Sequence, residues 1–274
     1  MEDGSRVVVE ARKVDLVFET ADGPVHALSE IDLEINKGDF ISLIGPSGCG
    51  KTTLMRVIAD LEKPTGGDIK VNGMSPEEAR LQRAYGYVFQ SPALYPWRTV
   101  EGNLKLPLEI MGVEKAEQKK RTAEALEMVE LTGFEKKFPW QLSGGMQQRV
   151  SIARALTFYP DLLLMDEPFA ALDVQTRYKL QNFLLEIWER TKTTIVFVTH
   201  HIDEAINLAD RVVVLTAHPG RLLEMADITL PRPRDVSSKA FDEYRSNFFG
   251  RLRSEVSKAF DAQEMVEIMD TRIK

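Results

Sequence analysis

The chain has 274 residues, of which 43% are hydrophobic and 28% are charged, and its net charge is −7. These values are typical of a globular protein with one large domain or two modest ones, and the acidic charge gives no overall basic field to attract nucleic acid. No apolar run in the sequence approaches the length of a membrane span, and a single cysteine excludes an internal disulfide and fits a reducing cytoplasm.

Short β-strands are predicted for the N-terminal part of the chain. Residues that favour strands cluster or alternate, between turn signals rich in Gly, Pro, Asp and Asn, at 7–9, 13–18, 31–35 and 40–44. A further hairpin is suggested at 67–73, and 85–89 is another short strand. We therefore expect an antiparallel β subdomain at the N-terminus.

The glycine-rich stretch after the 40–44 strand is the G-x-x-x-x-G-K-[ST] phosphate loop, with the sequence Gly45-Pro46-Ser47-Gly48-Cys49-Gly50-Lys51-Thr52. Apolar residues at helical spacing follow from Thr53, so the motif has the strand, loop and helix context that it needs. Glycines let backbone N–H groups turn around an anion, and the positive end of the helix dipole points at the same place. Lys51 is predicted to reach the outer phosphates of a nucleotide, and the Thr52 hydroxyl to ligate Mg²⁺.

The only cysteine of the chain, Cys49, lies inside this loop. We interpret it first as a small loop residue. A helix N-terminus can also lower the pKa of a thiol, so Cys49 is in addition a candidate reactive group.

A helical pattern covers residues 100–131, where apolar side chains recur at helical spacing. The candidate buried positions are Leu104, Leu106, Leu108, Ile110, Ala123, Leu126 and Val129. We expect Gly102, Pro107 and Gly112 to break this stretch into pieces, because these residue types interrupt helices.

Strands and helices alternate in the next part of the chain. The runs at 162–165 and 194–198 are continuously apolar, as expected for strands that are buried on both faces. An amphipathic helix is predicted between them at 178–190, and 212–215 is one more strand. This alternation predicts a parallel sheet covered by helices.

Two carboxylates, Asp166 and Glu167, end the apolar run at 162–165. Alone, they would be read as solvated acids at the end of a strand. In a chain that also has a phosphate loop, we expect Asp166 to hold Mg²⁺ opposite Thr52, and Glu167 to polarise the attacking water.

Residues 142–149 are the most discriminating stretch of the sequence. Ser143 is followed by Gly144 and Gly145, and these residues open a run of helical apolar spacing. They predict a second helix N-terminus with a bare backbone, with Ser143 as its N-cap, and hence a second anion site. One nucleotide does not need two such sites from one chain.

The end of the chain, residues 236–274, is predicted to be a helical extension that follows a proline-rich step. Helical spacing relates Phe241, Tyr244, Phe248, Leu252, Val256 and Phe260, and it continues after a possible break with Met265, Ile268 and Met269. We expect this extension to pack against the body of the protein or against a partner.

With the phosphate loop and the two carboxylates, the stretch 142–147 makes the chain resemble the nucleotide-binding subunits of ATP-binding cassette transporters, over about residues 8–220. In that family the stretch corresponds to the signature motif, and subunits pair head to tail. The resemblance implies that Ser143 and Gly145 of one chain face the γ-phosphate bound by Lys51 of the other. This pairing would account for the second anion site.

Other positions resemble the family residue by residue. Gln90 resembles the glutamine that links the Mg²⁺ site to the membrane partner and serves as a metal ligand and catalytic residue, and Asp173 resembles the aspartate at the dimer seam. His200 resembles the switch histidine that hydrogen-bonds the γ-phosphate, and Phe18 the aromatic residue that stacks on adenine.

Two shorter stretches, 95–100 and 230–235, resemble importer subunits of the nitrate, sulfonate and taurine group. The first contains Trp97, beside a proline turn. This tryptophan fits an interaction surface for the membrane partner, and it fits a buried core position equally well.

The resemblance implies an α/β fold, with a RecA-like P-loop NTPase core, an N-terminal antiparallel β subdomain and an inserted helical subdomain at about 91–160, all within a cassette at 1–235. It implies an ATPase that binds ATP and Mg²⁺ at two composite sites of a homodimer and drives a separate transmembrane permease. An extracytoplasmic solute-binding protein would be a further partner, and the subunit would lie peripherally on the cytoplasmic face of the membrane. No nucleic acid partner is expected.

Two other classes of protein remain as alternatives. A soluble cassette ATPase that acts on nucleic acid or ribosomes would usually contain a long coiled-coil insertion or two tandem cassettes, and this sequence contains neither. A phosphotransferase built on the same loop would need an acceptor pocket and would leave the stretch 142–147 unexplained. The transported solute stays open, because the solute meets other subunits.

Overall fold

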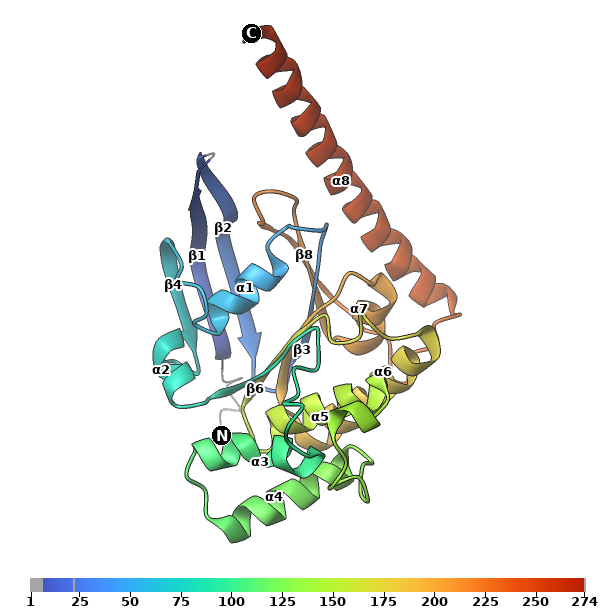
Figure 1. Ribbon diagram of the computed structural model, residues 1–274. Helices are drawn as coiled ribbons and strands as arrows, with labels where there is room; N and C mark the ends of the chain where they lie inside the picture. The colour runs from blue at the N-terminus through green and yellow to red at the C-terminus, as the bar shows by residue number, and fades with distance from the viewer. Residues whose placement is uncertain (1–6, 22, 274) are drawn as a thin grey trace, which may run out of the picture. The chain divides into compact units, whose positions relative to one another are not determined.

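The computed structural model describes residues 7–21 and 23–273, with side chains up to residue 258. The chain divides into two compact units (Figure 1). The first unit comprises Met1–Arg80 and Val198–Lys274, and the second comprises Leu81–Phe197. The domain boundaries expected from the sequence describe a different division and stay a prediction.

An antiparallel sheet in the first unit contains β1 (Val7–Thr20), β2 (Gly23–Asn36) and β4 (Gly66–Val71), in the order β2-β1-β4. The two strands predicted at 7–9 and 13–18 are one continuous strand. The sequence suggests a gap between them. In the structure, Lys13 has a φ of 46° and the pairing register shifts there, so the strand bulges instead of ending. The predicted antiparallel subdomain is confirmed.

The hairpin suggested at 67–73 is wrong. Only β4 forms there, and it pairs with β1, with Val71 opposite Val9. The returning chain makes a single bridge between Val71 and Met74. The turn signals at 72–73 are real, but the strand's partner is distant in sequence, which local turn chemistry does not reveal.

The first unit also contains the strand that precedes the phosphate loop. This strand, β3 (Phe40–Ile44), is completely buried and pairs in parallel with β8 (Arg211–Leu215), which pairs in turn with the antiparallel β9 (Leu222–Asp227). Helices α1 (Lys51–Ile58) and α7 (Ile202–Leu208) follow the carboxyl ends of strands. A short helix, α2 (Pro76–Leu81), follows β4.

The second unit has its own parallel pair, β5 (Tyr85–Val88) with β6 (Leu162–Asp166). The strand β7 (Thr194–Val198) is buried along its whole length, as its continuous apolar run predicts. The helix predicted at 178–190 is longer than expected. It is α6 (Val174–Thr191), because Asp173 caps its N-terminus, so that the helix begins four residues before the predicted start at Tyr178.

Three helices and one 3₁₀ turn make up the rest of the second unit, namely α3 (Val100–Ile110), α4 (Lys115–Met128), η1 (Pro139–Gln141) and α5 (Gly144–Leu156). The expected breaks at Gly102 and Pro107 are wrong. Gly102 lies in the first turn, where its N–H donates to Thr99 Oγ1 at 3.1 Å, and α3 accommodates Pro107 in its interior. Gly112, with a φ of 68°, does follow the end of the helix.

Most of the predicted buried positions of this stretch are buried or half-buried, but two predictions are wrong. Ile110 is 64% exposed and Ala123 is also exposed. Ile110 is the last residue of α3, beyond the part of the helix that packs on its neighbours, and Ala123 lies on the outer face of α4. Apolar spacing alone does not tell where a helix ends.

The C-terminal extension is a single helix, α8 (Lys239–Ile273), without the possible break. Phe241 and Phe248 are fully buried, and α8 contacts α7. Tyr244 and Leu252 are half-buried, whereas Val256 is exposed. The other positions of the predicted stripe lie outside the described side chains.

The segment before α8 is fixed by Arg234, which is buried among carbonyl groups. Its guanidinium donates to Ala209 O at 2.6 Å, to Ile228 O at 3.1 Å and to the carbonyl of Ile206. Burial lowers the pKa of Arg234 to about 10, which leaves it protonated at neutral pH. The arginine therefore ties the segment at 230–235 to the end of α7.

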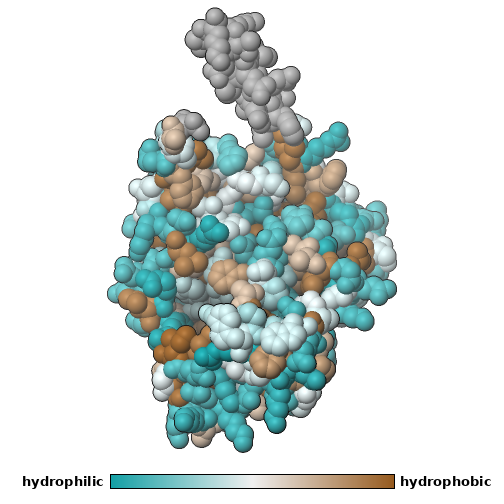
Figure 2. Space-filling model, in the orientation of Figure 1, coloured by the Kyte–Doolittle hydropathy of each residue, from teal (hydrophilic) through white to brown (hydrophobic). Residues whose placement is uncertain are grey.

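Within the described part of the chain, no helix is long and apolar enough to cross a membrane. The apolar side chains that Figure 2 shows on one face lie in scattered patches among hydrophilic ones.

Candidate functional site

The phosphate loop connects β3 to α1 in the first unit, and its lysine is already fixed in place. Lys51 Nζ donates to Gly45 O and to Pro46 O, both at 2.9 Å, and the side chain is only 6% exposed. Gly50, with a φ of 95°, precedes α1, and no side chain caps the helix. The N–H groups at the start of α1 and the ammonium group together form a cradle for an anion.

Two glycines of this loop have no room for a side chain. A Cβ on Gly45 would lie 2.5 Å from Cys49 Sγ and 3.1 Å from Leu215 O. A Cβ on Gly50 would lie 2.8 Å from Ala27 O, and the positive φ of Gly50 adds strain for any other residue. The loop is thus packed tightly between β2 and β8.

The thiol of Cys49 is not activated, contrary to one expectation from the sequence. Its side chain is buried, and burial raises the pKa of Cys49, although Lys51 Nζ lies 3.6 Å from Sγ and opposes this effect. Burial disfavours the thiolate more than the neighbouring charge favours it. Cys49 therefore acts as a small apolar residue that fills the base of the loop.

His200 follows a residue that is hydrogen-bonded to the strand before the phosphate loop. Thr199 N donates to Leu43 O at 3.2 Å, and Leu43 lies two residues before the loop. His200 is exposed, and its ring centroid lies 4.1 Å from that of His201. Phe18, on β1, is half-buried and lies opposite Val25 of β2.

In the second unit, Asp166 and Glu167 lie at the carboxyl end of β6, and both are half-buried. Glu167 has a φ of 45°, a left-handed conformation that costs free energy for a residue with a side chain. The parallel pairing of Val88 with Met165 brings Gln90, two residues beyond β5, to the same edge. The structure therefore places these three predicted site residues together.

The signature stretch at 142–147 and Asp173 are also brought together. Ser143 is the N-cap of α5, as predicted, and its Oγ accepts from Met146 N at 3.3 Å. A Cβ on Gly145 would lie 2.6 Å from Thr176 Cγ2, so the start of α5 packs closely on the start of α6. Asp173 caps α6 through a hydrogen bond from Thr176 N at 3.0 Å, and hydrogen bonds from the side chain and the backbone N–H of Thr176 lower the pKa of Asp173.

The predicted site residues thus form two sets. Phe18, His200 and residues 45–53 belong to the first unit. Gln90, Asp166, Glu167, Asp173 and residues 143–145 belong to the second. The assignment of these residues to one catalytic site stays a prediction.

The donor set expected for Mg²⁺ fits that ion. Thr52, Gln90 and Asp166 offer a hydroxyl, an amide and a carboxylate oxygen, and Mg²⁺ prefers oxygen ligands. Among the described residues there is no group of three or more His, Cys, Asp or Glu side chains that could hold a metal by themselves.

Sequence reasoning missed the loop after β8, which packs directly on the phosphate loop. A Cβ on Gly220 would lie 2.1 Å from Cys49 O, and a Cβ on Gly48 would lie 3.3 Å from His218 Nε2. The only sequence signal is the Pro-Gly turn at 219–220, which predicts a turn but not its neighbour.

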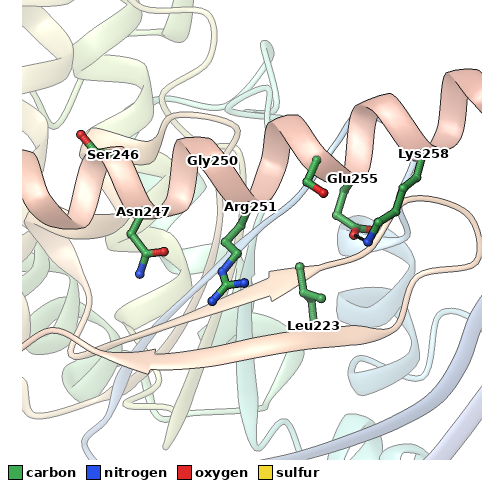
Figure 3. A pocket seen from close by; sticks show the side chains of 8 residues that line it. Leu223, Ser246, Asn247, Gly250, Arg251, Glu255 and Lys258 are labelled. Carbon is green, nitrogen blue, oxygen red and sulfur yellow. Dashed lines mark hydrogen bonds and ion pairs between the residues drawn. The ribbon is translucent and has the colours of Figure 1, made fainter.

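A cavity of about 370 Å³ lies between β9 and α8 (Figure 3). Its charged groups are paired with one another or with a neighbour. Lys258 Nζ lies 2.6 Å from Glu255 Oε1, and Arg251 Nε lies 3.2 Å from Glu224 Oε2. None of the lining residues belongs to the predicted nucleotide site.

The sequence matches the family model described as ABC transporter over residues 28–170. An uncharacterized ABC transporter ATP-binding protein of Methanocaldococcus jannaschii is 49% identical over 257 residues, which cover 94% of this chain and 96% of that protein. An aliphatic sulfonates import ATP-binding protein of Bacillus cereus is 44% identical over 239 residues, which cover 87% of this chain and 93% of that protein.

Solved structures show the same likeness. A dimeric ATP-binding cassette in a post-hydrolysis state, bound to ADP and Pi, is 34% identical and matches with a TM-score of 0.71 over 80% of this chain and 98% of that one. The cbiO1 protein of Clostridium perfringens, part of the cbiONQ complex, is 27% identical, with a TM-score of 0.73 over 81% of this chain and 89% of that one. These matches confirm the predicted α/β fold with a RecA-like core.

Proposed function

Because the chain belongs to the ABC transporter family and is an ATPase of that family, we propose that it drives solute import through a separate transmembrane permease. The observation that carries the proposal is the pair of glycine-rich helix N-termini, one at the start of α1 in the first unit and one at the start of α5 in the second. Two anion sites on one chain suit a subunit that shares each nucleotide with a second copy.

Each proposed site binds Mg·ATP between two copies of the chain, arranged head to tail. The phosphate loop and Lys51 of one copy bind the outer phosphates, and Phe18 stacks on the adenine. Ser143, Gly144 and Gly145 of the other copy offer N–H groups to the γ-phosphate. The dimeric cassette with ADP and Pi supports this arrangement by likeness.

Hydrolysis in this proposal is an in-line attack of water on the γ-phosphorus. Glu167 accepts a hydrogen bond from the water and polarises it, and His200 donates to the γ-phosphate oxygen. Thr52, Gln90 and Asp166 would hold Mg²⁺, which neutralises charge on the phosphates when it is bound. Asp173 lies beside the signature stretch and would meet the second copy at the seam.

A crosslinking experiment tests the head-to-tail dimer. Ser47 and Ser143 are both exposed, so cysteines at these positions are accessible in a Cys49→Ser background. When a chain with Ser47→Cys is mixed with a chain with Ser143→Cys, we expect an ATP-dependent disulfide between chains, measured as a doubled mass on a denaturing gel.

The control pairs Ser47→Cys with Lys239→Cys, a position on α8 that is also exposed. This pair should give no ATP-dependent product. A third sample is one chain that carries both Ser47→Cys and Ser143→Cys. If this chain crosslinks only within itself, and the mixed chains never crosslink, the head-to-tail dimer is wrong.

The permease is proposed to bind an aromatic surface of the second unit. This surface consists of Tyr95, Trp97, Phe138 and Trp140, of which the two tryptophans are 71% and 66% exposed. The Tyr95 and Trp97 rings lie 5.3 Å apart, and the Phe138 and Trp140 rings stack at 4.5 Å. Tyr95 follows Gln90 by five residues and Trp140 precedes Ser143 by three in the sequence, and exposed aromatic side chains at these places suit a contact that senses both loops.

The Trp97→Ala variant should keep its basal ATPase activity and lose most of the increase in rate that the copurified permease causes. The tryptophan contributes contact area and is not among the residues assigned to the reaction. Ile110→Ala, which removes another exposed apolar side chain from the same unit, is the matched control. Full stimulation of the Trp97→Ala variant would contradict this surface.

The solute is proposed to be of the nitrate, sulfonate or taurine type. The stretches 95–100 and 230–235 support this assignment, as do relatives named as aliphatic sulfonates importers. The subunit would then lie on the cytoplasmic face of the membrane, and a solute-binding protein would deliver the solute from the other side.

A further inference from the structure

Helix α5 carries one arginine that reaches the loop after Gln90. Arg154 Nη1 donates to Ala93 O at 2.9 Å, and Nη2 donates to Pro92 O at 3.2 Å. The side chain is half-buried, and this desolvation lowers the pKa of Arg154. Two hydrogen bonds from one charged group to adjacent carbonyls fix both the position and the orientation of that loop.

The conformation that Arg154 stabilises is a strained one. Ala93 has a φ of 46°, in the left-handed region that residues with a Cβ rarely adopt. A free loop would relax from this conformation. The bond to Ala93 O therefore opposes relaxation at a point three residues beyond Gln90.

The other end of the same segment is fixed by Asn103, which is fully buried in α3. Its Oδ1 accepts from Tyr95 N at 2.8 Å, and its Nδ2 donates to Tyr95 O, Arg98 O and Thr99 O at 3.0–3.2 Å. Residues 92–99 are thus bound to α5 at one end and to α3 at the other.

Near its N-terminal end, α5 also hydrogen-bonds the segment at 139–142, which leads into the signature stretch. Gln147 Nε2 donates to Pro139 O at 3.0 Å and to Leu142 O at 3.3 Å. Helix α5 is therefore hydrogen-bonded to two segments. Arg154, near its end, holds the loop that follows Gln90, and Gln147, near its start, holds the stretch that contains Ser143.

We propose that Arg154 is a positioning residue for the reaction, which fixes Gln90 for binding of Mg²⁺ and couples the Gln90 loop to the signature helix. The inference rests on the proposed role of Gln90. Arg154 itself touches neither nucleotide nor metal in this account. Its loss lets the segment at 91–96 relax and displaces the amide oxygen of Gln90 from the metal.

The test compares Arg154→Met, which keeps an unbranched side chain like the aliphatic part of arginine but has no donors, with Arg154→Lys, which keeps one donor group. For Arg154→Met we expect the Mg²⁺ concentration for half-maximal ATPase activity to rise about tenfold, as for the loss of a hydrogen bond to a charged group. Affinity for ATP in EDTA should not change, because the phosphate loop is intact. Amide hydrogen exchange at 91–96 should become faster. In both the Mg²⁺ requirement and the exchange rate, Arg154→Lys should lie between Arg154→Met and the unchanged protein.

Arg149→Met is the matched control. Arg149 lies on the same helix and also bonds a carbonyl and a carboxylate, those of Val129 and Glu130, but not the Gln90 loop. For Arg149→Met, the Mg²⁺ concentration for half-maximal ATPase activity and the amide hydrogen exchange at 91–96 should match those of the unchanged protein. An Arg154→Met protein that behaves like this control overturns the inference.

Gln90→Ala separates this inference from the proposed function. A rise in the Mg²⁺ requirement of Gln90→Ala without a rise for Arg154→Met would leave the metal role of Gln90 intact and overturn the role of Arg154. An unchanged Mg²⁺ requirement in Gln90→Ala would remove the metal role of Gln90, and the inference with it.

Discussion

The Glu167→Gln variant is expected to bind ATP normally and to hydrolyse it about 100 to 10,000 times more slowly, the range that a positioned general base contributes. Glutamine has the size of glutamate but cannot take a proton from the attacking water. Lys51 and the phosphate loop, which supply the binding, lie in the other unit of the chain and are unchanged. Phosphate release measures the rate, and equilibrium binding of ATP measures the affinity.

The same variant should accumulate as an ATP-bound dimer, detectable as a doubled mass by size-exclusion chromatography with light scattering. The dimer forms on ATP binding and is released only by hydrolysis in the proposed cycle. Glu189→Gln, an exposed carboxylate on α6, is the control and should behave as the unchanged protein. Near-normal turnover of Glu167→Gln would remove this residue from the role of base.

Lys51→Ala should weaken ATP binding by about 10- to 150-fold, because a hydrogen bond from a charged group is worth roughly 1.5–3 kcal/mol. The loss has two parts. The ammonium group no longer meets the β- and γ-phosphates, and the carbonyls of Gly45 and Pro46 lose the partner that fixes the loop in this structure. Isothermal titration with ATP measures the affinity.

Because Lys51 is buried, its removal can also affect folding, so thermal unfolding without nucleotide is measured in parallel. Lys63→Ala, on the surface of the same unit, is the control for charge. A folded Lys51→Ala protein with unchanged affinity for ATP would contradict the assignment of the phosphate loop.

Much of the candidate site could be predicted because its motifs are local. The phosphate loop is a run of eight consecutive residues, and its geometry follows from glycines, a preceding buried strand and a following helix. The N-cap at Ser143 is equally local, since a serine hydroxyl bonds an N–H three residues away. The buried strands β6 and β7 were predictable from continuous apolar runs.

Other features depend on contacts between distant parts of the chain. The raised pKa of Cys49 depends on burial of its side chain in the folded protein, and the helix N-terminus alone suggested the opposite shift. The continuity of β1 through Lys13 depends on pairing with β2 and β4, which tolerates a bulge where the sequence suggests a gap.

The sequence by itself determined the family, the nucleotide cradle and the residues that are candidates for catalysis, because each depends on residue type within a short span. Only the tertiary structure decided that Trp97 is a surface residue and that Arg154 bonds the loop at Ala93, 61 residues earlier in the chain. The physical reason is that a side chain's type limits which bonds it can make. The packing of distant segments decides which of those bonds form and which side chains remain in water.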